Sequence, residues 1–402
     1  MITEVLSSLK NYCESEHFKG WDPYDGVNSK IFQAIPFLRN SKLCRLVIIQ
    51  AFKRSPVNFR RIALVPKGYN PKGIGLLLQG YCNIYKAILN DPSLVILGTK
   101  EDIEERINQL AELLLSLQSK GYSGTCWGYN ADWQARSILY FPKYTPNVVV
   151  TNFCATALMD AFEVTGNKAY LDASLSSAEF VMNDLHRTTC NGGELFSYSP
   201  LPGNDTVFNA SLLGSRLLSY CYHYTKKSEY LTAAKNSVIA CCNSQNEDGS
   251  WVYGMLPVQS WVDSFHTGYN LDGLIAYEEL TGDRTYHRNI EKGFKFYIEN
   301  FFENDGCPKY YHNKKYPIDI HCPGQLCPTL FRLHKFDIYE GLASKVINWT
   351  IDNMQDRKGF FYYQIKRFSK TKIPYMRWSN AFMLYSLSYY ILYLSGEITK
   401  KV

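Results

Sequence analysis

An internal repeat constrains the fold of this chain more than any other feature of its sequence. Three segments align without gaps: TNFCATALMDAFEVTGNKAYLD from Thr151, SLLGSRLLSYCYHYTKKSEYLT from Ser211 and TGYNLDGLIAYEELTGDRTYHR from Thr267. In each copy a Thr ends the first helix and a Tyr follows five positions later, and a weaker copy places His334 and Tyr339 in these positions. A repeat of this length, built from a pair of helices, predicts a repetitive helical architecture.

Two kinds of helix alternate along the chain. One is apolar nearly all round, which predicts a buried helix, and the next is amphipathic, which predicts an outer helix. Six pairs result and predict an all-α fold, an (α/α)6 toroid, with an open right-handed solenoid as the alternative. Buried helices are expected near 71–90, 147–164, 206–224, 264–281, 320–333 and 376–394, and outer helices near 30–54, 101–119, 168–186, 228–243, 284–302 and 336–355.

The connections between these helices are unequal in length. Links from inner to outer helices are tight turns such as TGNK and TGDR, whereas the opposite links are long and carry Gly followed by alternating aromatics, as in NGGELFSYS and EDGSWVYG. We expect short β-hairpins there, all on one face, where the N-termini of the inner helices also open and favour an anion. Residues 1–402 are expected to form a single domain, with residues 1–26 as a lead-in.

Composition narrows the class of protein. The net charge of +6 is mild and the basic residues are spread out, apart from KRFSKTK at Lys366 to Lys372, so no nucleic-acid partner is expected. The aromatic content of 15%, with 31 Tyr, suits a groove that stacks sugar rings. Twelve Cys without zinc spacing, and a start without a signal pattern, predict a cytoplasmic protein without a metal or other cofactor. The apolar C-terminus is too short for a clean membrane span, so no transmembrane segment is expected.

Candidate site residues fall in the long connections and at the starts of the inner helices. The stretch VDSFHTGYNLDGL supplies Asp263, His266, Tyr269 and Asp272; the first could cap the helix, and His266 and Tyr269 lie one turn apart and could pass a proton. The final connection supplies Tyr363, Arg367, Lys370, Tyr375, Arg377 and Trp378, in which an Arg could hold a carboxylate. Packing, capping or a solvated basic loop explains the same residues without a site.

Three further stretches carry candidates. CWGYNADWQARS supplies Trp127, Tyr129, Asp132, Trp133 and Arg136, which could stack on a sugar and hydrogen-bond to it, or simply pack. Elsewhere the candidates are Trp251 in the fourth connection, His312, Asp319 and His321 in the fifth, and Asp22 and Asp25 in the lead-in, where turn formation is the simpler explanation.

Several of these stretches carry a resemblance to a known family. KGWDPYDGVNS, WGYNADWQARS, SFHTGYNLDGL and YYQIKRFSKTKIPYMRWSNA together resemble the VpsJ-like bacterial polysaccharide biosynthesis proteins, over most of the chain. The last stretch is also similar to the C-terminal helical domain of heparosan glucuronyl C5-epimerases, and this local match reaches only Tyr363, Arg367, Arg377 and Trp378. The resemblance implies a function in the biosynthesis of a cell-surface polysaccharide.

Four functions follow as hypotheses. The first is an enzyme that modifies a glycan or sugar, including an acidic one such as a uronate, by epimerase- or lyase-like acid/base chemistry. Tyr363 or His266 would be the base, and Arg367 or Arg377 would bind the carboxylate. The second is a glycoside hydrolase that pairs Asp263 with Asp205, Asp272 or Asp319. The others are a non-catalytic glycan-binding or assembly protein and an isoprenoid-binding toroid.

Overall fold

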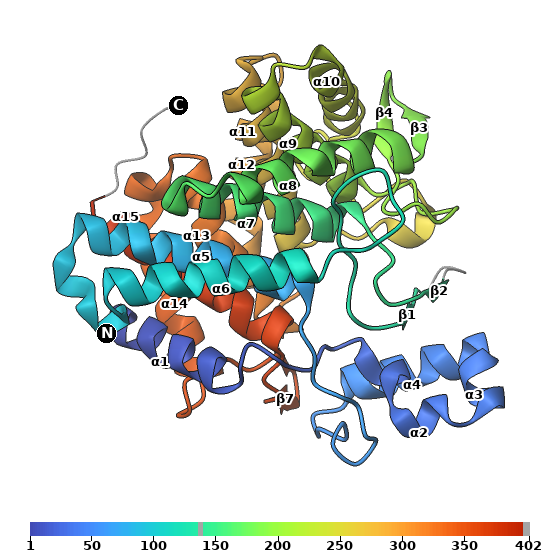
Figure 1. Ribbon diagram of the computed structural model, residues 1–402, viewed down its shortest axis with the longest axis vertical. Coiled ribbons are helices and arrows are strands. Elements are labelled where there is room, and N and C mark those ends of the chain that lie inside the picture. The colour runs from blue at the N-terminus through green and yellow to red at the C-terminus, as the bar shows by residue number, and fades with distance from the viewer. Residues whose placement is uncertain (136–139, 397–402) are drawn as a thin grey trace.

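Six inner helices form a closed ring in the computed structural model, which describes residues 1–135 and 140–396 (Figure 1). Each inner helix contacts the next in chain order, and the last contacts the first. The closed contact between α15 and α5 confirms the toroid over the open solenoid. The inner helices are α5 (Pro71–Asn90), α7 (Val148–Thr165), α9 (Phe208–Thr225), α11 (Ser264–Thr281), α13 (His321–Arg332) and α15 (Phe382–Leu394).

The outer helices pack around this ring, and one of them is not where the sequence pattern placed it. Helix α1 (Ile2–Ser15) contacts α15 and buries Val5, Leu6 and Leu9, so it occupies the sixth outer position within the expected lead-in. The other outer helices are α6 (Lys100–Ser116), α8 (Lys168–Glu179), α10 (Ser228–Cys242), α12 (His287–Phe301) and α14 (Phe336–Met354).

The prediction of an outer helix over residues 30–54 is therefore wrong. This segment is divided into α2 (Lys30–Gln33), α3 (Pro36–Asn40) and α4 (Lys42–Arg54), because Pro36 starts one helix and the Ser41 hydroxyl caps the next. Its own small core contains Val27, Phe32 and Ile49, and it projects beside the ring (Figure 1).

Glycines at the start of the long connections explain how the outer layer is joined. A Cβ on Gly193 would meet the backbone of α10, and one on Gly306 would come within 2.5 Å of the Lys345 carbonyl oxygen in α14. Gly359 faces the Ser8 carbonyl of α1 at the same 2.5 Å. Each connection thus lies directly on the backbone of the next outer helix, and the last one lies on α1.

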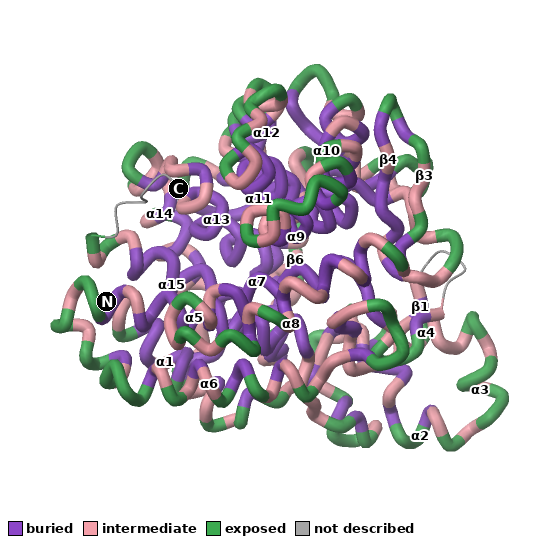
Figure 2. Tube along the Cα trace, turned by 45° about the horizontal axis from the view of Figure 1, so that its top comes forward, coloured by how far each residue is buried: buried purple, intermediate pink, exposed green. Residues whose placement is uncertain are grey.

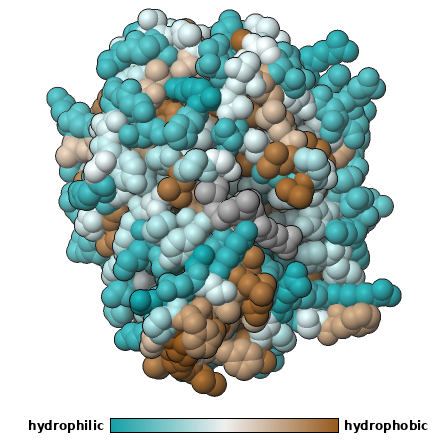
Figure 3. All heavy atoms as spheres, turned by 90° about the vertical axis from the view of Figure 1, so that its right-hand side faces the viewer, coloured by the Kyte–Doolittle hydropathy of each residue, from teal (hydrophilic) through white to brown (hydrophobic). Residues whose placement is uncertain are grey.

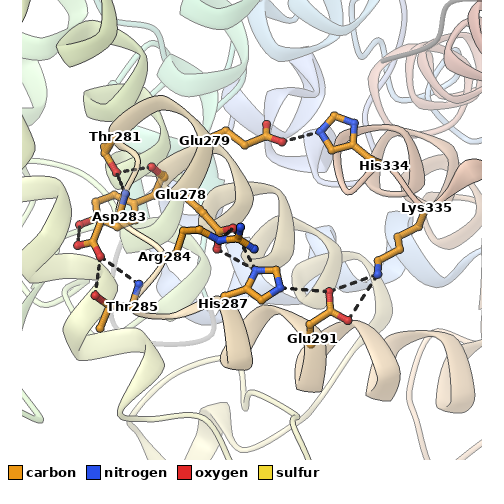
Figure 4. Close-up of polar contacts among 11 residues, drawn as sticks. Glu278, Glu279, Thr281, Asp283, Arg284, Thr285, His287, Glu291, His334 and Lys335 are labelled. Atoms are coloured by element: carbon orange, nitrogen blue, oxygen red, sulfur yellow. Dashed lines mark hydrogen bonds and ion pairs between the residues drawn. The ribbon is translucent and has the colours of Figure 1, made fainter. Parts of the chain in front are cut away.

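The tight turns gather on the opposite face. Gly166, Lys226 and Gly282 follow α7, α9 and α11 in the left-handed conformation, which ends each helix at equivalent repeat positions. Polar contacts join neighbouring turns: His334 Nε2 bonds to a Glu279 carboxylate oxygen at 2.5 Å, and Lys335 pairs with Glu291 at 3.3 Å (Figure 4).

Short strands occupy the long connections, as expected, although not in all of them. The strands are β1 (Trp133–Gln134) with β2 (Tyr140–Phe141), β3 (Arg187–Cys190) with β4 (Gly193–Phe196), and β5 (Ile318–Asp319), β6 (Gln364–Lys366) and β7 (Ser369–Thr371) in one antiparallel sheet. The EDGSWVYG stretch contributes only an isolated bridge between Val207 and Gly254.

The core lies between the inner and outer helices and along the ring, where the chain is mostly buried (Figure 2). Among the described residues, α7 is the one helix long and apolar enough to cross a membrane, and 72% of it is buried in the ring. The apolar C-terminal helix α15 is likewise buried, and all twelve Cys are free thiols.

Candidate functional site

His266 lies at the mouth of the ring, in the first turn of α11, and is fixed there by Asp263. Asp263 caps the helix through Oδ1, which accepts the His266 backbone N–H at 3.0 Å. Its Oδ2 accepts from Trp261 Nε1 at 2.9 Å and lies 2.7 Å from His266 Nδ1. Because a carboxylate can only accept, the proton of the neutral imidazole lies on Nδ1, and in that form Nε2 carries the lone pair.

The accessible edge of this imidazole is the part that can react. The His266 side chain is 21% exposed, whereas that of Asp263 is only 1% exposed. In the part of the chain that the structure describes, no hydrogen bond is made to His266 Nε2. Tyr253 lies 4.8 Å away between ring centroids. The arrangement is that of an oriented general base or, once protonated, a general acid.

Aromatic side chains from the lead-in and from the long connections surround this point. Tyr253 stacks on Trp261 at 4.5 Å, and Trp133 stacks on Phe141 at 4.3 Å. Phe141 is buried, whereas Tyr253, Trp261 and Trp133 are only partly buried and keep a face or an edge available to a ligand. The half-buried rings on this side of the molecule are Tyr24, Tyr129, Trp133, Tyr198, Tyr253, Trp261 and Tyr310. They form what we call the aromatic mouth, the kind of surface on which sugar rings stack.

Arg377 provides a buried positive charge beside the mouth. Its Nε bonds to the Asp22 carboxylate at 2.5 Å, and its guanidinium lies 5.0 Å from the Tyr129 ring and 4.9 Å from the Trp378 ring. The Asp22 carboxylate helps to hold the pKa of Arg377 above its usual value even though burial opposes this. The side chain is therefore a permanent cation.

A buried chain of hydrogen bonds runs below the mouth. Lys72 Nζ, at the start of α5, donates to the Tyr269 hydroxyl at 3.2 Å, and this hydroxyl lies 2.9 Å from His321 Nε2. Burial lowers the pKa of Lys72 well below its usual value and raises that of Tyr269. Burial and then Lys72 also lower the pKa of His321, which is therefore neutral. This chain of hydrogen bonds positions the side chains at the floor of the site.

Asp319 anchors the other side of this floor. Its Oδ1 accepts from Trp378 Nε1 at 2.8 Å and from the His321 backbone N–H at 3.0 Å, and its Oδ2 accepts from Gln364 Nε2 at 2.9 Å. Burial raises the pKa of Asp319 to about 6. Both oxygens are engaged, so this carboxylate orients Trp378 and His321.

A cavity of about 580 Å³ opens beside Arg377 at the start of α5. Its lining includes Asp22 and Asp25 of the lead-in, Asn70 at the start of α5 and Asp132 of the second connection, but neither His266 nor a ring of the aromatic mouth. Its size suits a sugar of one to a few rings. The predicted candidates Arg377 and Asp132 thus line one cavity, although they are 245 positions apart in the chain.

The structure does not bring all the predicted candidates together. Arg367 is exposed at the turn between β6 and β7, where it lies over Phe368 at 5.2 Å. Trp251 is buried in the outer layer and donates to the Cys241 carbonyl at 2.9 Å. Asp272 is buried in the ring, bonded to Gln325 and paired with Arg332. Arg136 lies outside the described residues.

Tyr363 lies below the surface of the site. It is 1% exposed and packs against Tyr375 at 5.2 Å. Burial raises the pKa of its hydroxyl well above the usual value, so the group stays protonated at neutral pH. It is therefore unsuited to act as a base, and His266 is the better candidate.

Lys72 and several mouth aromatics were missed from the sequence. Lys72 is the single charge in the first turns of an apolar inner helix, PKGIGLLLQG, and this contrast could have marked it. Tyr198, Tyr253 and Tyr310 belong to stretches whose alternating rings pointed to hairpins, whereas Tyr24 lies in the lead-in and Trp261 lies just before α11. Across the described residues, no group of three or more His, Cys, Asp or Glu could hold a metal ion.

Solved structures with the same fold exist, whereas no family model and no curated protein sequence matches the chain. An α-mannanase of glycoside hydrolase family 76 from Bacteroides thetaiotaomicron superposes with a TM-score of 0.59 at 14% identity, over 80% of this chain and 86% of that one. A cellobiose 2-epimerase from Bacillus thermoamylovorans has a TM-score of 0.59 at 13% identity, over 80% and 89%.

An unsaturated glucuronyl hydrolase specific for heparin has a TM-score of 0.56 at 13% identity, over 81% of this chain and 87% of that one. At these identities the likeness establishes the (α/α)6 toroid and nothing finer.

Proposed function

We propose that this protein is an enzyme that modifies a glycan by proton transfer, with His266 as the acid/base group. The observation that carries the proposal is the Asp263–His266 pair, with Nδ1 held at 2.7 Å and Nε2 open to an aromatic mouth. A histidine fixed in this way can remove a proton from a sugar carbon or hydroxyl and return it. Asp263 keeps the imidazole in the productive tautomer and stabilises its positive charge once it is protonated.

The substrate class we propose is an acidic sugar, such as a uronate within a glycan. Removal of a proton next to a carboxylate builds negative charge, and Arg377 and the N-termini of the inner helices favour that charge. Arg377 already pairs with Asp22, so a substrate carboxylate would share or replace this partner. The mouth aromatics would stack on the sugar rings. Epimerisation or β-elimination is the chemistry that this arrangement serves.

The activities named for proteins of the same fold support a carbohydrate substrate. They include a mannanase, a cellobiose 2-epimerase and a glucuronyl hydrolase. The resemblance to VpsJ-like proteins supports a place in surface polysaccharide synthesis. A hydrolase with paired Asp has less support, because Asp263 and Asp319 each use both oxygens for neighbouring donors, and Asp272 is paired with Arg332.

The experiment is incubation of the purified protein with uronate oligosaccharides and with neutral disaccharides in deuterated water. We expect deuterium next to the carboxylate, or an unsaturated end, in the uronate products, read by NMR and mass spectrometry. A cleaved linkage without deuterium would favour the hydrolase. Binding without any change of product would favour a non-catalytic glycan-binding protein.

A matched pair of variants tests the role of the imidazole. His266→Gln should reduce the rate about 10²-fold or more, because the acid/base group is lost. His287→Gln is the control, since its Nδ1 also lies 3.0 Å from a carboxylate, that of Glu278, but on the turn face (Figure 4). Equal rates for the two variants would contradict the proposal.

A further inference from the structure

The segment that projects from the ring (residues 30–64, containing α2, α3 and α4) exposes apolar side chains to an unusual extent. Of the 22 large apolar residues that are exposed in the described chain, eight lie in these 35 positions. Phe37 is 73% exposed, Leu43 70% and Ile62 77%. The other five are Ile31, Val47, Val57, Phe59 and Leu64. An exposed concentration of this kind marks an interaction surface.

Helix α4 shows that the exposure is not a by-product of packing. Ile49 and Phe52 on one side are buried against the protein, whereas Leu43 and Val47, four positions apart, share a face turned to solvent. Helix α4 therefore has two apolar faces, and the rest of the protein buries only the face with Ile49 and Phe52. Figure 3 shows apolar residues gathered at the lower end of the face that this segment occupies in Figure 1.

The same segment is strongly basic. No Asp or Glu occurs between Gly26 and Asn90, whereas residues 30–67 contain nine Lys and Arg. Some of them serve the protein: Arg60 pairs with Asp25 and Lys67 with Glu16. Others are exposed and form no ion pair in the part of the chain that the structure describes. These are Lys30, Arg39, Lys42, Arg54 and Arg61.

We propose that residues 30–64 dock the protein on an anionic lipid membrane. Apolar side chains flanked by Lys and Arg are what a helix needs to lie in the headgroup region, with its apolar face among the acyl chains and its cations on lipid phosphates. A second copy of the chain would bring like charges together, and a nucleic acid would leave the apolar side chains uncovered. An anionic lipid membrane would both cover the exposed apolar side chains and pair with the exposed Lys and Arg.

Docking in this way places the aromatic mouth beside the membrane. The segment is tied to the mouth by Lys53, which donates to the Tyr24 hydroxyl at 2.6 Å, and by Arg45, which donates to Gln134 at 3.1 Å. The proposal does not depend on the chemistry at His266, because it rests on different residues and is measured by binding alone.

The test is flotation of the full-length protein with vesicles of phosphatidylcholine, alone or mixed with phosphatidylglycerol. We expect flotation only with the phosphatidylglycerol vesicles, and weaker flotation at high salt. Arg39→Glu combined with Lys42→Glu should reduce the partition coefficient at least twentyfold, because each lost cation is worth about fivefold. Leu43→Ser combined with Val47→Ser should reduce it about tenfold or more.

Ile338→Ser and Lys295→Glu are the controls, since both residues are exposed on the outer helices α14 and α12, and these variants should float like the wild type. All variants should melt at the wild-type temperature. Absence of flotation with both kinds of vesicle, or flotation unchanged by both double variants, would overturn the proposal. A wild-type dimer that Leu43→Ser disperses in light scattering would also overturn it and assign the surface to a second copy.

Discussion

His266 occupies the third position after the N-cap of α11, where the equivalent inner helices α7 and α9 carry Val150 and Ala210. The ring therefore packs without an imidazole at this position, and packing does not require one. The N-cap of α11 has a second role, since Asp263 supports both the helix and the imidazole. Asn147 caps α7 by the same bond to the third residue, and α9 begins with Val207, which has no side-chain cap. The same Asp263 side chain therefore stabilises the start of α11 and orients the imidazole of His266.

Asp263→Asn separates these two roles. Asn also caps helices well, so the loss of stability should be small, about 1 kcal/mol or less. The amide no longer requires a proton on His266 Nδ1, so the tautomer changes and the rate should fall about 10²-fold. Thermal melting and the deuterium-incorporation rate measure the two effects. A rate that falls only in proportion to the folded fraction would contradict the assignment.

Asp319 makes the stability of the protein depend on pH. Its pKa is about 6 in the folded protein, above the ordinary value of 3.8, so the folded state holds the proton more tightly. Its contribution to the free energy of unfolding is complete below about pH 4 and is lost as the pH rises through 6. Asp319→Asn should therefore gain about 1–2 kcal/mol relative to the wild type between pH 5 and pH 8.

Urea unfolding of both proteins at the two pH values measures this difference. Parallel pH profiles of wild type and variant would show that the folded-state pKa of Asp319 is not raised.

At the scale of the elements, the repeat is a helix, a left-handed turn residue and a second helix. The turn residue is Gly166 after α7 and Gly282 after α11, but Lys226 after α9, with φ of 56°. The Cβ of a non-glycine residue is strained in this conformation. The unit around α9 therefore holds strain that its two neighbours avoid.

Lys226→Gly should relieve this strain and raise the free energy of unfolding by about 0.5–1 kcal/mol. The Lys226 side chain contributes little in return, since its Nζ lies 5.4 Å from the Tyr222 ring and forms no ion pair among the described residues. Chemical denaturation measures the change, and Lys226→Ala is the control that removes the side chain and keeps the strain. An equal gain in both variants would contradict the explanation.

At the scale of the molecule, closure of the ring depends on two segments at opposite ends of the chain. Helix α1 lies on α15, and the last long connection rests on α1 through Gly359. The N-terminal segment thus completes the outer layer that the C-terminal helices would otherwise leave open.

Gly359→Ala tests this closure. Gly359 and Gly282 both have positive φ, of 93° and 77°, so Ala is strained at either position. Only at Gly359 does the new Cβ meet the backbone of α1, whereas nothing lies within 4 Å at Gly282. We expect Gly282→Ala to cost about 1 kcal/mol and Gly359→Ala at least about 2 kcal/mol more, measured by urea unfolding. An equal loss of stability in both variants would show that α1 does not contact this connection closely.

The sequence pattern was enough to predict the number of helical units, the inner or outer position of most helices and the face that carries the candidate site. These properties are local, because the spacing of apolar residues within a helix predicts whether that helix is buried. His266, with its cap Asp263, could be found in the same way. The first outer helix could not, because α1 precedes the repeat, and the segment 30–54 has a helical pattern without a place in the ring.

Which of the candidate residues lie close together depends on how the ring closes. Arg377 pairs with Asp22 across 355 positions, and Lys72 reaches Tyr269 across 197. Arg367, ten residues before Arg377, is left on an exposed turn. Such pairings arise when the ring closes and brings the ends of distant helices to one mouth. The periodicity within one helix carries no information about that closure. Residues that are close in the sequence can therefore lie far apart in the structure, and residues that are distant in the sequence can meet.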